Sequence, residues 1–136
     1  MRRAMLVVVI ALLAAAARLI ITHHSATQAR AAGLVLVATG VPLMVISRAQ
    51  LGKSFAVGPK ATALVTRGLY AKLPHPLYVF FDLVLLGIVI AVQVPWLVAV
   101  WLAIIAAQSW QARRESKVLE QAFGEDYRKY RAQTWW

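Results

Sequence analysis

One apolar stretch dominates the chain, YVFFDLVLLGIVIAVQVPWLVAVWLAIIAA (residues 78–107), in which Asp82 is the one charged residue. Only Gln93-Val94-Pro95 separates its two halves, and a proline there ends one helix and favours the start of another. With its flanking residues, each half approaches the ~20 residues that cross a bilayer core. The stretch therefore predicts two transmembrane helices, at about 76–93 and 95–112, that form a tight antiparallel hairpin.

Two more apolar runs, Met5–Ile21 and Leu34–Ile46, predict further spans at about 4–22 and 31–47. The chain is 61 % hydrophobic, above the usual 45–50 % of soluble domains. Core helices of a soluble bundle would show polar faces at helical spacing, and these are missing. We predict an all-α polytopic membrane protein, a single domain over residues 1–136 with four transmembrane helices. The first run follows Arg2 and Arg3 like a signal peptide, but without a convincing cleavage site, so we expect it to be retained.

The basic residues predict the orientation. The 15 Lys and Arg lie mostly before the first span, between the second and third, and after the fourth. By the positive-inside rule, both termini and the loop from Arg48 to His75 are cytoplasmic. The net charge of +10 also suggests nucleic acid, but these bases lie beside lipid, so attraction to anionic headgroups explains them and no nucleic-acid partner is predicted. The sequence does not indicate an oligomeric state.

A basic cytoplasmic helix is predicted after the fourth span, at about 113–134. Gly124 should interrupt it, and a second turn would carry Tyr127 and Tyr130 at a spacing of three. Because the hairpin is tight, this helix must lie beside the start of the third span. The loop and the helix can thus close one pocket at the headgroup level.

The segment Leu73-Pro74-His75-Pro76 leads into the third span. The prolines hold Leu73 and His75 extended, so a helix begins only at Pro76, and His75 is presented near free helix N–H groups. Two interpretations stay open: His75 helps to form a pocket for a polar ligand, or it merely caps the helix.

The other titratable residues of the spans give weaker indications. Asp82 is either functional, as intramembrane acids usually are, or paired in a salt bridge with Lys72, Arg113 or Arg114. Arg18 is expected to snorkel. His23 and His24 are adjacent and therefore point apart on a helix, so we predict no metal site. The absence of cysteine excludes disulfides and thiolate catalysis.

Several ordered motifs from Arg48 onward resemble the isoprenylcysteine carboxyl methyltransferase and phospholipid methyltransferase family of integral membrane enzymes. They are Leu51-Gly52-Lys53-Ser54-Phe55, Leu64-Val65-Thr66-Arg67-Gly68-Leu69-Tyr70, His75-Pro76-Leu77-Tyr78, Arg114-Glu115-Ser116-Lys117-Val118-Leu119 and Phe123-Gly124-Glu125-Asp126-Tyr127-Arg128-Lys129-Tyr130.

The resemblance implies S-adenosylmethionine as the cofactor, bound in a cytoplasmic pocket between the His-Pro segment and the C-terminal helix. The methyl acceptor would be a lipid-like amphiphile that enters from the bilayer. Glu115 would hold a polar part of the cofactor, and Tyr127 and Tyr130 would close the lid. The other implied cofactor-binding residues are Gly68, Tyr70, Leu73, His75, Pro76 and Tyr78.

Two kinds of methyl acceptor are compatible with transfer from S-adenosylmethionine. Arg114 and Glu115 are the candidate catalytic residues. A prenylcysteine-type carboxylate would need a basic neighbour, for which Arg114 or Lys72 could serve. A phospholipid amine would need a proton acceptor, for which Glu115 or Asp82 could serve.

Three positions depart from the family pattern: Leu69 replaces a proline, Pro74 an arginine and Ser116 a glutamate. Pro74 and Ser116 replace residues of opposite charge that could be partners in the pocket. These departures leave open an alternative function, a non-catalytic lipid- or isoprenoid-binding membrane protein of the same fold. A related reductase branch is a third alternative.

Overall fold

A computed structural model of the chain describes residues 28–52 and 64–135. Its regular elements are α2 (Gln28–Leu51), the short 3-10 helix η2 (Gly68–Ala71), α3 (Pro76–Val92) and α4 (Trp96–Ala132). The predicted all-α fold is confirmed for this part of the chain. The predicted first span, with Arg18, His23 and His24, lies outside the described residues.

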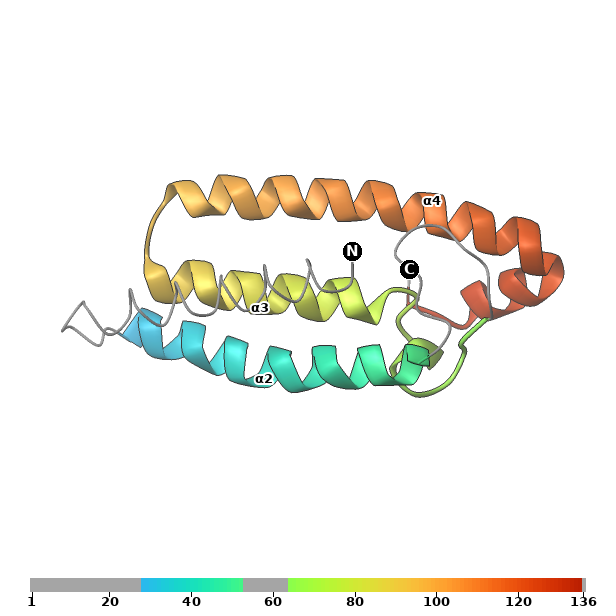
Figure 1. Cartoon of the computed structure of the whole chain (residues 1–136), viewed down its shortest axis with the longest axis horizontal. Coiled ribbons are helices and arrows are strands. Elements are labelled where there is room, and N and C mark those ends of the chain that lie inside the picture. Colours follow the sequence, from blue (N-terminus) through green and yellow to red (C-terminus); the bar gives the residue numbers. More distant parts are fainter. Residues whose placement is uncertain (1–27, 53–63, 136) are drawn as a thin grey trace.

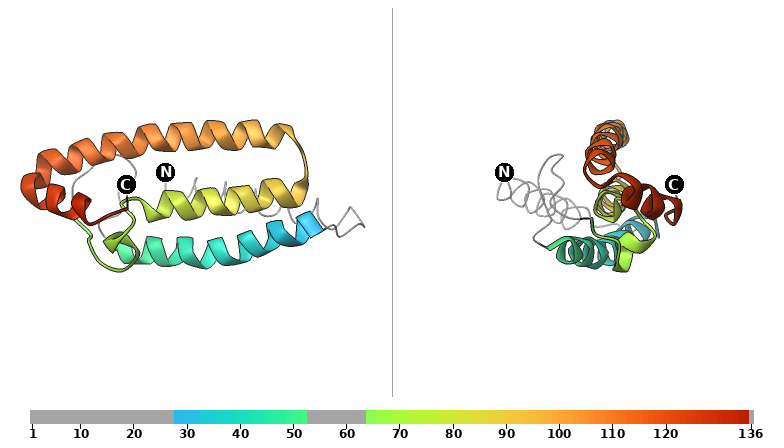
Figure 2. Two further views of the ribbon diagram at one scale, coloured as in Figure 1. Left: turned by 180° about the vertical axis from the view of Figure 1, so that it is seen from behind. Right: turned by 90° about the vertical axis from the view of Figure 1, so that its right-hand side faces the viewer.

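The three long helices run side by side, with α3 packed against both α2 and α4 (Figure 1). The link between α3 and α4 lies at one end of the bundle. The segment that leads into α3 lies at the other end, beside the C-terminal residues (Figures 1 and 2). The predicted hairpin thus places the start of α3 and the second half of α4 at the same end.

The bounds of α3 follow from local backbone chemistry. The helix starts at Pro76, whose fixed φ suits a first helical residue and whose missing N–H is not needed there. It ends at Val92, and the capping residue Gln93 adopts a left-handed conformation (φ 58°) and donates its N–H to the carbonyl of Val89 at 3.1 Å. Pro95 then precedes α4.

Helix α4 continues from the predicted fourth span into the predicted C-terminal helix without a break, because neither glycine nor proline occurs between Trp96 and Phe123. The backbone leaves the helical conformation at Gly124 (φ 50°, ψ −117°), where the sequence predicts an interruption. A positive φ favours glycine. After Gly124 the chain folds back toward the segment before α3 (Figure 2).

Among the described helices, α2 is long and apolar enough to cross a membrane, by length and composition. Helix α3 is also apolar but has 17 residues, or about 26 Å of helix. Large apolar side chains stay exposed on α2 and α4, among them Val35, Trp96 and Leu102. A surface of this kind suits lipid better than water.

Glycines allow α2 and α3 to approach closely. A Cβ on Gly33 would lie 2.5 Å from the Gly87 carbonyl oxygen, and one on Gly87 would lie 2.7 Å from the Gly33 carbonyl oxygen. Further along α2, a Cβ on Gly40 would lie 2.8 Å from the side chain of Val84. Small residues that let backbones meet are a common means of helix association in membranes.

We expect Gly87→Val to destabilise the protein by about 1–3 kcal/mol, because the new side chain would press on the backbone of α2. Thermal unfolding in detergent measures the loss. The matched control is Ala99→Val on the exposed surface of α4, which should melt like the parent protein. Equal melting temperatures for both variants would contradict the close contact.

Candidate functional site

The segment before α3 is held first by the end of α2. Gly68 has a positive φ of 64°, and a Cβ there would lie 2.5 Å from the side chain of Gln50. The carbonyl oxygen of that side chain accepts the N–H of Leu69 at 2.8 Å. Gly68 is therefore needed both for its conformation and for its lack of a side chain.

The C-terminal segment holds the same loop from the other side. The Tyr130 hydroxyl donates to the carbonyl of Tyr70 at 2.7 Å, and the N–H of Trp135 donates to the carbonyl of Lys72 at 3.0 Å. Tyr70 and Tyr130 are both buried. Burial raises the pKa of Tyr130 to about 12, so its hydroxyl remains protonated and able to donate.

His75 is placed by the prolines on either side of it. Its carbonyl accepts the N–H groups of Tyr78 and Val79 at 3.1 and 3.3 Å, which closes the first turn of α3. Its side chain makes no capping hydrogen bond and instead faces α4. His75 is therefore the N-cap residue of α3 through its backbone, as one of the two interpretations has it, while its side chain is left for other contacts.

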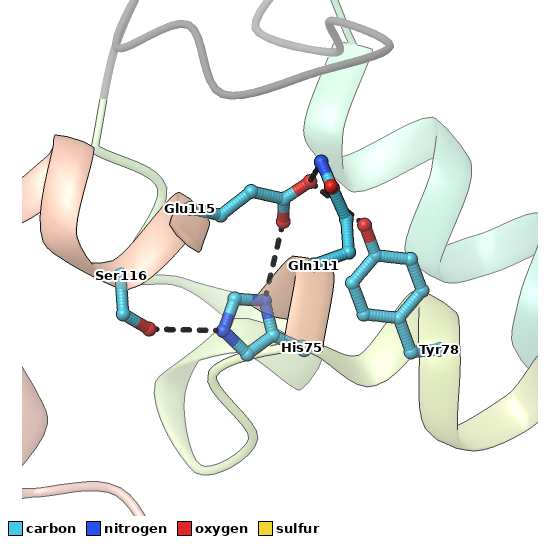
Figure 3. Close-up of polar contacts among 5 residues, drawn as sticks. All are labelled: His75, Tyr78, Gln111, Glu115 and Ser116. Carbon is cyan, nitrogen blue, oxygen red and sulfur yellow. Dashed lines mark hydrogen bonds and ion pairs between the residues drawn. The ribbon is translucent and has the colours of Figure 1, made fainter. Parts of the chain in front are cut away.

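A polar cluster forms where α3 begins against α4 (Figure 3). The Tyr78 hydroxyl donates to Glu115 Oε1 at 2.7 Å, and the Gln111 amide donates to the same oxygen at 3.2 Å. His75 Nδ1 lies 3.6 Å from Glu115 Oε2, while His75 Nε2 lies 3.3 Å from the Ser116 hydroxyl. We call His75, Tyr78, Gln111, Glu115 and Ser116 the Glu115 cluster.

The protonation state of His75 results from opposing influences. Burial disfavours the charged imidazolium, and the positive charge of Arg131 adds to this effect. The Glu115 carboxylate at 3.6 Å acts in the opposite direction. Burial dominates and lowers the pKa of His75 to about 4, so the ring is neutral at pH 7. It also stacks on Tyr78, with ring centroids 5.7 Å apart.

The other predicted site residues lie outside the Glu115 cluster. Leu73 donates its N–H to the Leu69 carbonyl at 3.1 Å, and Pro76 is fully buried. The guanidinium of Arg114 lies over the Trp110 ring, 4.7 Å from its centroid, and not in the Glu115 cluster. Tyr127 is buried beside Tyr130, and its hydroxyl has no hydrogen-bond partner among the described residues.

Asp82 lies deeper along α3 and pairs with an amide. Gln108 Nε2 donates to Asp82 Oδ1 at 2.8 Å, and Trp101 Nε1 donates to the Asp82 carbonyl at 3.3 Å. The three cations predicted as alternative partners, Lys72, Arg113 and Arg114, form no salt bridge with it. The salt-bridge interpretation was wrong because a glutamine on α4 occupies that place.

Three glutamines of the site were missed by the sequence analysis: Gln50, Gln108 and Gln111. Each hydrogen-bonds across elements or within the cluster. The signal that could have found Gln111 is its spacing of four from Glu115 on the same helix face.

A groove borders the cluster on the other side of His75. It has a volume of about 710 Å³ and lies between Pro74-His75 and the α4 residues from Ser109 to Lys117, with Arg131 at its edge. Pro74 and Ser116, both of which depart from the family pattern, line it together. We call this the basic groove, because Arg113, Arg114, Lys117 and Arg131 are among its lining residues.

The comparisons with known proteins agree with the motifs. The family model described as phospholipid methyltransferase matches residues 28–126, which include α2, α3, the Glu115 cluster and most of α4. The chain belongs to the phospholipid methyltransferase family. No curated protein and no solved structure matches it. Membership of this family supports methyl transfer on a lipid-type substrate and a membrane setting.

The lowered pKa of His75 predicts a pH dependence of stability. Between pH 6.5 and about pH 4, His75 is protonated in the unfolded chain but stays neutral in the folded protein. The stabilisation is therefore complete above pH 6.5 and is lost progressively as the pH falls toward 4, by up to about 3 kcal/mol.

Thermal unfolding of the parent protein and of His75→Gln between pH 7.5 and 4.5 measures this effect, since all other titrations are common to both. We expect the parent to lose more stability than the variant over this range. Parallel curves would show that His75 has an ordinary pKa.

The two tyrosines of the C-terminal segment should respond differently to loss of the hydroxyl. Tyr130→Phe leaves the Tyr70 carbonyl without its donor and should cost about 1–3 kcal/mol in unfolding free energy. Tyr127→Phe removes a buried hydroxyl that has no described partner, so stability should stay the same or rise slightly. A larger fall in the melting temperature for Tyr127→Phe than for Tyr130→Phe in detergent would contradict these roles.

Proposed function

We propose that this protein transfers a methyl group from S-adenosylmethionine to an amphiphile held in the membrane. The acceptor would be a phospholipid amine or a prenylcysteine-type carboxylate. We further propose the four-span arrangement, with spans at about 4–22, 31–47, 76–93 and 95–112 and both termini cytoplasmic. The observation that carries the proposal is the Glu115 cluster, which lies within the matched family region where α3 begins against α4.

The residues of the cluster fit a sulfonium cofactor in charge and in hydrogen-bonding groups. A neutral His75 does not repel a cation, as an imidazolium would. Glu115 offers a carboxylate for an ammonium or a ribose hydroxyl, and Tyr78 offers an aromatic ring near it. The buried hydroxyl of Tyr127 is a further polar group without a described protein partner. When bound, S-adenosylmethionine supplies an electrophilic methyl group.

The protein would position the reacting groups and exclude water from them. Tyr78 and Gln111 both donate to Glu115, so its carboxylate is fixed before a ligand arrives. The loop held by Gln50 and Tyr130 would cover the reacting groups. For an amine acceptor, Glu115 or Asp82 would take the proton. For a carboxylate acceptor, Arg114 or Lys72 would supply the positive charge.

Calorimetric titration of the detergent-solubilised protein with S-adenosylmethionine and S-adenosylhomocysteine tests the proposal. We expect micromolar binding that weakens at least tenfold in His75→Ala and in Glu115→Gln, since a hydrogen bond to a charged group contributes about 1.5–3 kcal/mol. Tyr127→Phe should lose affinity without losing stability.

Glu120→Gln is the matched control, because Glu120 pairs with the exposed Arg128 at 2.9 Å, away from the cluster. It should bind like the parent. Absence of binding in a folded parent protein would contradict cofactor use and favour the alternative of a non-catalytic lipid-binding protein. If binding is found, labelled methyl transfer to phosphatidylethanolamine and to a prenylcysteine identifies the acceptor.

A further inference from the structure

The basic groove has an unbalanced charge. Four of the ten residues that line it are Arg or Lys, and none is Asp or Glu. Two acids of α4 have partners of their own: Glu115 accepts from Tyr78 and lies 3.6 Å from His75, and Glu120 accepts from Arg128. The lining residues thus offer no acidic partner to the three cations of α4, Arg113, Arg114 and Lys117.

The groove also has a defined position along α4. The first part of the helix exposes apolar side chains, including Val98, Val100 and Leu102, and this exposed surface ends at Trp110, which is 62 % exposed. Trp110 lines the groove, and the cations begin three residues later. Tryptophan is typical of the membrane–water interface, so the groove opens at the level of the lipid headgroups.

Its cations come from two parts of the chain. Arg113, Arg114 and Lys117 project from α4, whereas Arg131 follows the reversal at Gly124 and belongs to the C-terminal segment. Arg131 also donates to the Thr134 hydroxyl at 3.2 Å. Guanidinium groups that converge from separate segments can each donate to a different oxygen of one phosphate.

From these observations we propose that the basic groove binds the phosphate of an anionic phospholipid, at a site that borders the Glu115 cluster and shares His75 and Ser116 with it. The exposed apolar surface of α4 next to Trp110 provides a place for the acyl chains, which a free phosphate would not need. An ammonium headgroup would find no acid in the groove, so a lipid with net negative charge fits better than a zwitterionic one. The bound lipid would join α4 to the C-terminal segment that holds the loop before α3.

Native mass spectrometry of the delipidated full chain, without cofactor, tests this site. Phosphatidylglycerol and phosphatidylcholine with the same acyl chains are the lipid probes, and inorganic phosphate is the third. We expect one phosphatidylglycerol to be retained preferentially. The double variant Arg113→Gln/Lys117→Gln should weaken its retention about 25-fold, about fivefold for each cation removed. Because no methyl donor is present, this result is independent of the proposed catalysis.

The matched control is Arg128→Gln/Lys129→Gln, which removes the same charge from exposed positions that do not line the groove. It should retain phosphatidylglycerol like the parent. Equal losses in the two double variants would overturn the proposal in favour of general electrostatic attraction. Retention of phosphatidylcholine or of inorganic phosphate equal to that of phosphatidylglycerol would overturn an anionic lipid as the occupant.

Discussion

The hydrogen bonds between α3 and α4 are the constraint on which the site depends. Close backbone packing at Gly33 and Gly87 joins α2 to α3, but α4 lies less closely against α3 and is held by polar groups. These are the Asp82–Gln108 pair, the Trp101 contact and the donation from Tyr78 to Glu115. In lipid, apolar packing alone gives little preference between helices, so such bonds also set the register of α4 against α3.

That register determines what His75 contacts. The short link at Gln93 starts α4 close to the end of α3, and α4 then returns along α3 to bring Glu115 and Ser116 opposite His75 (Figure 3). A shift of α4 by one residue would rotate Glu115 by about 100° and remove both contacts. The position of the site therefore follows from the hairpin as well as from the motif residues themselves.

Much of this arrangement could be predicted from local chemistry. Pro76 starts α3 and Gly124 ends the first part of α4 because proline and glycine restrict or release the backbone wherever they stand. The partners of Gln50 and Gln108 could not be predicted. A glutamine in a helix has no characteristic pattern, and its partner depends on tertiary packing. The salt-bridge alternative for Asp82 was wrong for this reason, since its side chain accepts from an uncharged amide.

The two faces of α4 explain how one helix can serve two chemical environments. Gln111 and Glu115 are four residues apart and therefore share the face turned to Tyr78, whereas Arg113, Arg114 and Lys117 line the groove beyond it. His75 lies at the boundary, with Nδ1 toward the carboxylate and Nε2 toward Ser116. A neutral ring separates the acid from the cations without adding charge to either side. Burial keeps this ring uncharged at neutral pH, so it adds no positive charge between the carboxylate and the cations of the groove.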